Sequence, residues 1–394
     1  MSQKRDNISL ERRQFLLGMT GLTGLFVTGC ALDSTNKSGS TATTLVNKAT
    51  VTTTVNKLTT TVSTVGMPQG HTLLIYKGHT NRVNDLVWSP DSKSIASYSS
   101  SYFQDQSSTR NYGVRKWDAT SGQDSFIHQT QGTNTLATLA WSPDGTRLAM
   151  SDGPAAGVDP LLLLDAVTGK VLVTGKKLHN SFYFQFVWSP DNSQVAVAGD
   201  MDVEIYDART GESSLTYPAN PSSSGNQYSY AVAWSPDGNI IASNALNTGH
   251  STQFWDAHSG NALHYFSGHK ASALAWSPNG KLIAIRDSTT VNIQNASTGQ
   301  MIFSLPVALP VVANEIGLPY GNVHPHSLAW SPDSTAIAIA NDQQEVQIWN
   351  IVSQKNIYTY KEHSGTVLAV GWSPDGTRIA STGVDKTVRV WQAQ

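Results

Sequence analysis

Trp88-Ser89-Pro90-Asp91 is the first of seven copies of one short turn sequence in this chain. The copies, one with Asn in place of Asp, have their tryptophans at Trp88, Trp141, Trp188, Trp234, Trp276, Trp330 and Trp372. Successive tryptophans are 42 to 54 residues apart. A period of about 40 to 50 residues indicates a repeat array, in which each small sheet buries its faces against its neighbours. The repeats therefore favour a binding scaffold over an enzyme.

Each repeat is predicted to form four short antiparallel strands. The first strand ends at the Trp-Ser-Pro turn, where Pro and the following Asp favour a tight reversal. The second strand alternates apolar residues, as in 194–197, and the third ends in an aromatic or aliphatic residue followed by a polar one, as in Trp117-Asp118. A second turn with a glycine, as in 165–169, leads into a short apolar fourth strand.

These repeats resemble the WD40 repeat family, whose blades carry Gly-His before the first strand and Trp-Asp after the third. Gly78-His79 and Gly268-His269 match the first feature. In that family a His, a second-strand Ser, a turn Asp and the third-strand Trp form a buried hydrogen-bonded tetrad. The last repeat supplies all four members: His363, Ser381, Asp385 and Trp391. Elsewhere the tetrad is incomplete, which predicts that the other blades depend on apolar packing.

The resemblance covers residues 71–394 and implies an all-β, seven-bladed β-propeller with four-stranded antiparallel blades. The last repeat stops after its third strand, whereas residues 71–76 read like a fourth strand that precedes the first Gly-His. We expect this N-terminal strand to pair with the last blade and close the ring. Closure removes a sheet edge that would otherwise promote aggregation.

The first thirty residues have the pattern of an export signal. The adjacent Arg12 and Arg13 precede a short apolar stretch, 15–27, which as a helix would rise about 20 Å, less than a bilayer core of about 30 Å. The segment resembles a twin-arginine signal. Val27-Thr28-Gly29-Cys30 resembles a bacterial lipobox, which implies that Cys30 is lipidated, and an ordinary cleaved signal is the alternative. We therefore predict a signal peptide at 1–29 and a lipid-anchored, extracytoplasmic bacterial protein.

Residues 30–66 comprise Cys30 and a stretch dominated by Thr, Ser, Val, Asn and Lys. Such a composition buries too little apolar surface to offset the entropy of ordering, so a flexible linker is predicted. The alternation of Val and Thr in 51–55 and 58–62 leaves a strand as the alternative. The propeller domain is predicted to span 67–394.

The overall composition excludes several kinds of site. The formal net charge of −2 is too small and of the wrong sign to attract nucleic acid. Cys30 is the only cysteine, so an intrachain disulfide and a thiolate-rich metal site are both impossible. The sequence has no Gly-x-Ser-x-Gly, no His-Glu-x-x-His and no phosphate-binding Gly-rich loop, so we predict no enzymatic activity and no cofactor.

The two short turns of each blade are expected on one rim of the ring. The other connections vary in length and belong to the opposite rim, where recognition usually resides. In WD40 propellers the residues six and four before the strand-one aromatic often face that rim. Transferred to this chain, the chemically distinctive positions are Arg82, Asn84, Phe182, Phe184, Tyr228, Tyr230, Lys270, His324 and His326.

Four of these residues, Phe182, Phe184, Tyr228 and Tyr230, would form an aromatic crescent on neighbouring blades. Aromatic side chains and Arg are typical interaction anchors. We expect the crescent to bind an extended polypeptide or a glycan. Neutral variation of the long loops and packing of the rings into the core are the alternatives.

Three classes of function remain open at this stage. The first is a protein–protein interaction scaffold in the bacterial envelope, with a protein or peptide as the partner. The second is a glycan or small-ligand receptor on the same face. The third is an enzyme, since 164–173 is similar to the repeats of pyrroloquinoline-quinone propellers, and His324 with His326 supplies two metal ligands but no placed third.

Overall fold

The computed structural model describes residues 41–46, 49–54, 59–63, 68–99, 113–130, 136–152, 160–177, 183–199, 202–218, 231–245, 251–267, 271–287, 290–307 and 327–393. The chain divides into two compact units, Met1–Gly66 and Met67–Gln394. The described residues contain no helix that is both long and apolar enough to cross a membrane.

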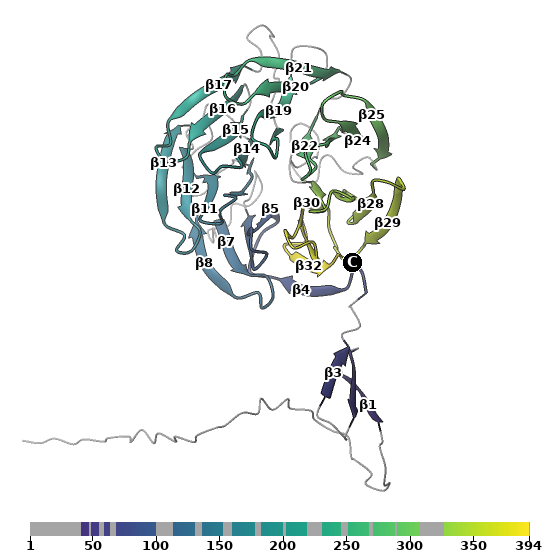
Figure 1. Cartoon of the computed structure of the whole chain (residues 1–394). Coiled ribbons are helices and arrows are strands. Elements are labelled where there is room, and N and C mark those ends of the chain that lie inside the picture. The colour runs from purple at the N-terminus through teal and green to yellow at the C-terminus, as the bar shows by residue number, and fades with distance from the viewer. Residues whose placement is uncertain are drawn as a thin grey trace, which may run out of the picture. The chain divides into compact units, whose positions relative to one another are not determined.

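The second unit is a seven-bladed β-propeller, as predicted, with the blades arranged in a ring (Figure 1). Blade 1 consists of β5 (Val83–Trp88), β6 (Ser94–Ser99), β7 (Gly113–Asp118) and β8 (Asp124–Gln129). Blade 2 consists of β10 (Ala140–Trp141), β11 (Arg147–Ser151), β12 (Pro160–Asp165) and β13 (Val171–Lys177). Blade 3 consists of β14 (Tyr183–Trp188), β15 (Gln194–Ala198), β16 (Asp202–Asp207) and β17 (Ser213–Pro218), and β9 (Leu136–Ala137) pairs with β14 in parallel.

The remaining blades have the same four-stranded antiparallel order. Blade 4 consists of β18 (Val232–Trp234), β19 (Ile240–Ala245), β20 (Ser251–Asp256) and β21 (Ala262–Ser267). Blade 5 consists of β22 (Ala273–Trp276), β23 (Leu282–Arg286), β24 (Thr290–Asn295) and β25 (Met301–Pro306). Blade 6 consists of β26 (Leu328–Trp330), β27 (Ala336–Ala340), β28 (Val346–Asn350) and β29 (Lys355–Tyr360).

Blade 7 is built from both ends of the propeller unit. Its strands are β30 (Val367–Trp372), β31 (Arg378–Gly383), β32 (Val388–Gln392) and β4 (Thr72–Tyr76). The N-terminal strand β4 pairs antiparallel with β32, with Tyr76 opposite Val388 and Ile75 opposite Arg389 (Figure 1). The predicted ring closure is thus confirmed.

The core lies between adjacent blades. Second and third strands are buried along nearly their whole length, as in β12, whereas fourth strands such as β8 alternate between partly buried and exposed residues. A strand covered on both faces is apolar throughout, and a strand at the outside of the ring alternates. Blade 7 and blade 1 share one such cluster, in which Tyr76 stacks on Trp117 with ring centroids 4.3 Å apart.

The described part of the first unit is a three-stranded antiparallel sheet. Its strands are β1 (Thr41–Val46), β2 (Ala49–Thr54) and β3 (Thr59–Ser63), in the order β1-β2-β3. The structure here differs from the flexible linker that the polar composition suggested. The β-branched Val and Thr residues favour extended backbone, and the strand left open by their alternation is what the structure shows.

Candidate functional site

The Trp-Ser-Pro turn has the same hydrogen bonds in all seven blades. In blade 4 the Ser235 hydroxyl donates to Asp237 Oδ1 at 2.5 Å and accepts the Ile240 backbone N–H at 2.9 Å. The hydrogen bond from Ser235 lowers the pKa of Asp237, so the carboxylate is ionised at neutral pH. The motif therefore builds one turn seven times on one rim, which we call the short-turn rim.

The fourth residue after each tryptophan has the left-handed backbone conformation. Four blades place glycine there, at Gly145, Gly238, Gly280 and Gly376, and three place Ser92, Asn192 or Ser334, with φ between 61° and 64°. Glycine adopts this conformation without a steric penalty, and Asn and Ser do so at a cost. The choice of residue at this position divides the seven junctions between blades into two kinds.

Three junctions are bridged by the side chain at this position. Asn192 of blade 3 accepts the Asp144 backbone N–H of blade 2 at 2.8 Å. Ser92 of blade 1 and Ser334 of blade 6 accept the equivalent N–H groups of Asp375 and Asn279, at 2.9 and 3.1 Å. We call 2/3, 5/6 and 7/1 the bridged junctions, and 1/2, 3/4, 4/5 and 6/7 the glycine junctions.

The tryptophan indoles follow the same division. In the bridged junctions each indole N–H donates to a backbone carbonyl of the preceding blade: Trp88 to Gly371, Trp188 to Ala140 and Trp330 to Ala275. In two glycine junctions the indole instead donates within its own turn: Trp234 to Gly238 and Trp372 to Gly376. In the other two, Trp141 and Trp276 find no hydrogen-bond partner for the indole N–H among the described residues.

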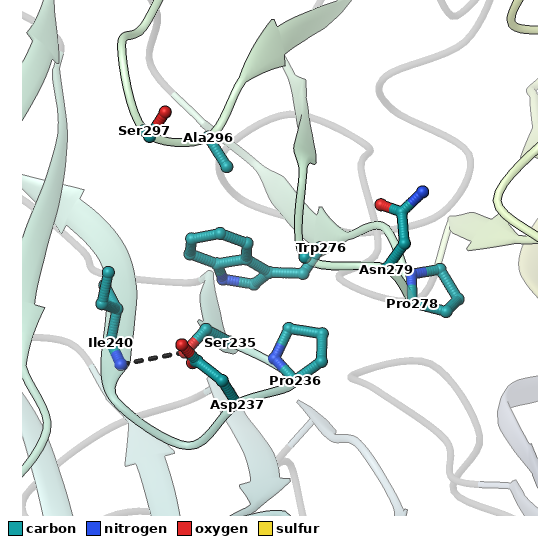
Figure 2. A pocket seen from close by; sticks show the side chains of 10 residues that line it. Ser235, Pro236, Asp237, Ile240, Trp276, Pro278, Asn279, Ala296 and Ser297 are labelled. Atoms are coloured by element: carbon teal, nitrogen blue, oxygen red, sulfur yellow. Dashed lines mark hydrogen bonds between the residues drawn. The ribbon is translucent and has the colours of Figure 1, made fainter.

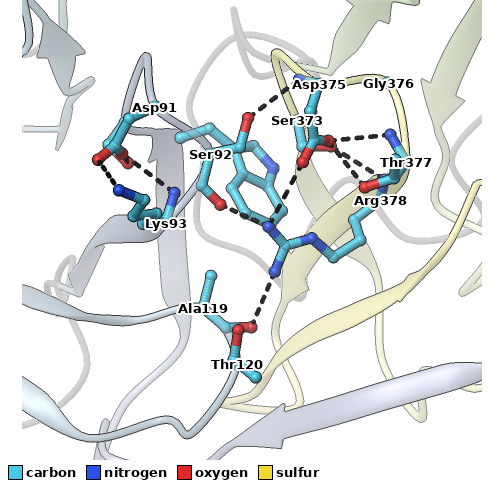
Figure 3. Close-up of polar contacts among 12 residues, drawn as sticks. Asp91, Ser92, Lys93, Ala119, Thr120, Ser373, Asp375, Gly376, Thr377 and Arg378 are labelled. Atoms are coloured by element: carbon cyan, nitrogen blue, oxygen red, sulfur yellow. Dashed lines mark hydrogen bonds and ion pairs between the residues drawn. The ribbon is translucent and has the colours of Figure 1, made fainter.

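Arginine reinforces two of the bridged junctions. Arg147 of blade 2 lies over the Trp188 ring, 4.9 Å from its centroid, and donates to the carbonyls of Ala208 at 2.7 Å and Asn192 at 3.1 Å. Arg378 of blade 7 stacks in the same way on Trp88. It donates to the carbonyls of Ser92 and Ala119 (Figure 3). In both junctions the guanidinium fills the space between the two turns.

The 4/5 junction has a cavity of about 460 Å³ at the corresponding place. Figure 2 shows the Trp276 ring between the turn of Asp237 on one side and Ala296 on the other. Ile240 stands where blades 2 and 7 have arginine. A smaller cavity of about 140 Å³ lies in the same position at the 3/4 junction, against Trp234.

The predicted tetrad residues come together in blade 7. His363 Nδ1 lies 2.9 Å from Asp385 Oδ2 and therefore donates to the carboxylate. His363 Nε2 lies 2.8 Å from the Ser381 hydroxyl, which also accepts the Trp391 indole N–H at 3.2 Å. Tyr360 of blade 6 stacks on Trp391 with centroids 4.4 Å apart. These contacts hold the ring-closing blade together.

Blade 1 carries a second set that differs from the prediction. His79 contacts the hydroxyl of Ser97 at 2.7 Å and that of Ser99 at 2.9 Å, and Trp117 donates to Ser97 at 3.0 Å. Ser99 thus stands in for the aspartate. The prediction that blades other than the last depend on apolar packing is therefore wrong for blade 1, because the Ser99 hydroxyl takes the place of the aspartate.

The two histidine sets have different electrostatics. Burial, together with the charge of nearby Arg115, lowers the pKa of His79 to about 3. Burial would raise the pKa of Asp385, but the hydrogen bond and charge of His363 outweigh it and hold that pKa well below its usual range. The blade 1 set is therefore neutral, whereas the blade 7 set contains an ionised carboxylate.

Most of the predicted partner-binding residues lie outside the described residues. Of the nine, the structure describes the side chains of Arg82, which is half-buried before β5, and of Asn84, which is 2% exposed within β5. Asn84 is thus a buried side chain rather than an exposed contact. Phe184 belongs to β14, whose backbone is described, and its side chain, like those of Phe182, Tyr228, Tyr230, Lys270, His324 and His326, is not.

The same first strands carry polar residues that the sequence patterns did not single out. Asp85, Thr138 and Gln185 each stand three residues before a turn tryptophan and accept a backbone N–H from the next blade: Leu139 at 2.5 Å, Phe186 at 3.1 Å and Val232 at 2.8 Å. All three side chains are buried. The available signal was a polar residue at a fixed distance before tryptophan in an otherwise apolar strand.

Comparisons with known proteins agree with the fold. The family model "WD domain, G-beta repeat" matches residues 70–105 and 354–392, which include strands from the two blades at the ring closure. A second family model, "Eukaryotic translation initiation factor eIF2A", matches residues 168–306. THO complex subunit 3 of Arabidopsis thaliana is 24% identical over 288 residues, which cover 70% of this chain and 78% of that protein. The chain thus carries WD40 repeats.

The same comparisons correct the predicted localisation. A protein of Arabidopsis thaliana and a family of eukaryotic initiation factors conflict with a lipid-anchored protein of a bacterial envelope. That prediction rested on Arg12, Arg13 and Cys30, which lie outside the described residues. A leader pattern of this kind needs only a few residues with loose spacing, whereas the matches to eukaryotic proteins cover 168–306 in one case and 70% of the chain in the other.

Proposed function

We propose that this WD40-repeat propeller is a non-enzymatic scaffold that binds a protein partner on the rim opposite the short turns. The proposal rests on one observation: the connections are regular on one rim and variable in length on the other. On the short-turn rim each connection repeats one hydrogen-bonded geometry, as in Ser142–Arg147 and Ser373–Arg378. On the other rim the connections range from 199–201 between β15 and β16 to 307–327 between β25 and β26.

A rigid ring with variable loops on one rim is suited to recognition. The relative from Arabidopsis thaliana is by its printed name a subunit of a complex, which supports a role in assembly for this chain also. The aromatic crescent of Phe182, Phe184, Tyr228 and Tyr230 remains our candidate for the contact surface. Arg82, predicted for an acidic group of the partner, is half-buried, and its Nε and Nη2 atoms are buried within the protein.

Affinity capture with the full chain tests this proposal. The crescent variant carries Phe182→Ala, Phe184→Ala, Tyr228→Ala and Tyr230→Ala. The matched control carries Val167→Ala and Val352→Ala, which change exposed side chains in turns on the opposite rim. We expect the crescent variant to lose a partner that wild type and control both retain. The unfolding midpoints of the three proteins should be alike. Retention of every partner by a stable crescent variant would overturn the assignment of the face.

A further inference from the structure

The cavity of the 4/5 junction has the tryptophan ring, the two carbonyls and the carboxylate of an arginine site, without the arginine. The turn positions can be compared directly, because β11, β19 and β31 begin at the same position of the repeat, at Arg147, Ile240 and Arg378. Trp276 occupies the place of the tryptophans on which those arginines stack. The carbonyls of Gly280 and Ala296 occupy the places of the two carbonyls that each arginine bridges, and both residues line the cavity.

The negative charge of the arginine junctions is also present. Arg378 lies 3.8 Å from the carboxylate of Asp375, three residues earlier in the chain. Asp237 has the same position in the blade 4 turn and lines the cavity. Among the described residues no hydrogen bond reaches the carbonyl oxygen of Gly280 or Ala296. Each carbonyl oxygen keeps its capacity to accept, so the pair is available to a ligand that donates to both.

At two of the other glycine junctions the chain itself donates to the corresponding carbonyls, and at the third it places a cation near the turn tryptophan. At 3/4, the Gly238 carbonyl accepts the Trp234 indole N–H and the Ala257 carbonyl lies 3.4 Å from the Tyr217 hydroxyl. At 6/7, the Gly376 carbonyl accepts from Trp372 and the Ala393 carbonyl accepts from Gln69. At 1/2, the Lys116 ammonium lies 5.8 Å from the centre of the Trp141 ring.

We propose that the 4/5 junction is a binding site for an arginine side chain of a partner protein. The guanidinium would lie flat on Trp276, donate to the carbonyls of Gly280 and Ala296, and face the carboxylate of Asp237. Its methylenes would pack against Ile240, as long cationic side chains commonly do along apolar surface. Lysine is a poorer fit, because its ammonium has no planar face that can lie flat on a ring while the edge donates to two carbonyls. The site lies on the short-turn rim, opposite the rim for which the aromatic crescent is proposed.

Titration with a small arginine probe tests this site. The full chain, labelled with ¹⁵N at its indoles, is titrated with N-acetyl-arginine-N-methylamide while the indole resonance of Trp276, assigned with Trp276→Phe, is followed. We expect a saturable shift of that resonance. The citrulline analogue, which keeps the shape and loses the charge, should bind about tenfold more weakly. No saturable shift at Trp276, or an equal one with citrulline, would overturn the proposal.

Ile240→Arg is the sharpest variant, since it places an arginine where blades 2 and 7 have one. We expect it to raise the unfolding midpoint and to abolish the probe-induced shift; unchanged probe binding in a folded Ile240→Arg protein would overturn the proposal. Asp237→Asn gives a second test that does not depend on the introduced arginine. Asn279 already occupies this turn position in blade 5, where it accepts from Ser277 at 2.8 Å, so the turn tolerates the amide.

Asp237→Asn should weaken probe binding about tenfold, and Asp191→Asn, the same change in the blade 3 turn, should leave it unchanged. Equal binding by these two variants would contradict the role of Asp237. Because the site and the crescent are proposed for opposite rims, the two proposals fail separately. Loss of the captured partner in the crescent variant with no probe shift at Trp276 would refute only the arginine site, and the converse result would refute only the crescent.

Discussion

The 2/3 and 4/5 junctions have the same turn hydrogen bonds and differ at two decisive positions. The 2/3 junction has Arg147 and Asn192, whereas the 4/5 junction has Ile240 and Gly280. With arginine and asparagine the chain closes its own junction through a stacked guanidinium and a side-chain bridge. With isoleucine and glycine the same rim has a cavity of about 460 Å³. The repeated turn therefore supplies the acceptors, and one or two side chains decide whether the chain itself uses them.

Arg378→Met should give the largest loss of stability at any junction. The guanidinium donates to the carbonyls of Ser92 and Ala119 and stacks on Trp88, and methionine keeps only the packing of the stem. Charged hydrogen bonds and cation–π contacts together predict a loss of about 3 kcal/mol. Urea unfolding followed by tryptophan fluorescence measures it.

Ile240→Met is the matched control at the 4/5 junction. It preserves volume and apolar character and removes no hydrogen bond, so we expect a cost under about 1.5 kcal/mol. Equal losses from Arg378→Met and Ile240→Met would remove the energetic difference between the two kinds of junction.

Mild acid should weaken the 7/1 junction selectively, through His79. The folded-state pKa of His79 is about 3 and the unfolded value is about 6.5, so the unfolded chain binds the proton between these values. Stability is therefore complete above pH 6.5 and falls as the pH is lowered toward 3. From pH 7 to pH 5 the linkage predicts a loss of about 2 kcal/mol from this group.

The variant His79→Gln separates the pH-dependent stability contributed by His79 from that of the other titrating groups. The depressed pKa of Asp385 contributes stability that is present above pH 4 and lost only in stronger acid, so it does not act in this window. Burial also lowers the pKa of His264, which both proteins retain. We expect the unfolding free energy of His79→Gln to be lower at pH 7 and to change less between pH 7 and pH 5. Parallel pH profiles would contradict the role of His79.

The fold was predictable because its determinants are local and repeated. Each Trp-Ser-Pro turn marks one blade, and the apolar strand at 71–76 has no other blade to complete, so its pairing with β32 followed. The bonding of the indoles was not predicted, because Trp88 and Trp276 stand in nearly identical turns. Their difference accompanies that between Ser92 and Gly280, and the Ser92 hydrogen bond crosses a blade junction.

The histidine sets show the same limit. The blade 7 residues could be named from the sequence, because each matched a family position. Ser99 of blade 1 was missed because a serine carries no charge that would mark it as the hydrogen-bond partner of His79. Asn84 illustrates the reverse error: its distance from Trp88 matched a rim position, yet packing buries it. Spacing along the chain predicts register, and burial depends on the neighbouring blade.

A single hydroxyl at position 280 should convert the 4/5 junction toward the bridged kind. An added Cβ at Gly280 meets no atom within 4 Å, so Gly280→Ala and Gly280→Ser share only the strain of a left-handed φ near +71°. By analogy with Ser92 and Ser334, the new hydroxyl is placed to accept the Asp237 N–H. We therefore expect Gly280→Ser to be about 1 kcal/mol more stable than Gly280→Ala, although both fall below wild type.

The same substitution should change the hydrogen bond of the Trp276 indole. In all three bridged junctions the indole N–H donates to a carbonyl of the preceding blade, so in Gly280→Ser the Trp276 indole should donate to the Ala233 carbonyl and exchange its hydrogen more slowly. If the two variants have equal stability and equal indole exchange, the residue four positions after tryptophan does not determine the kind of junction.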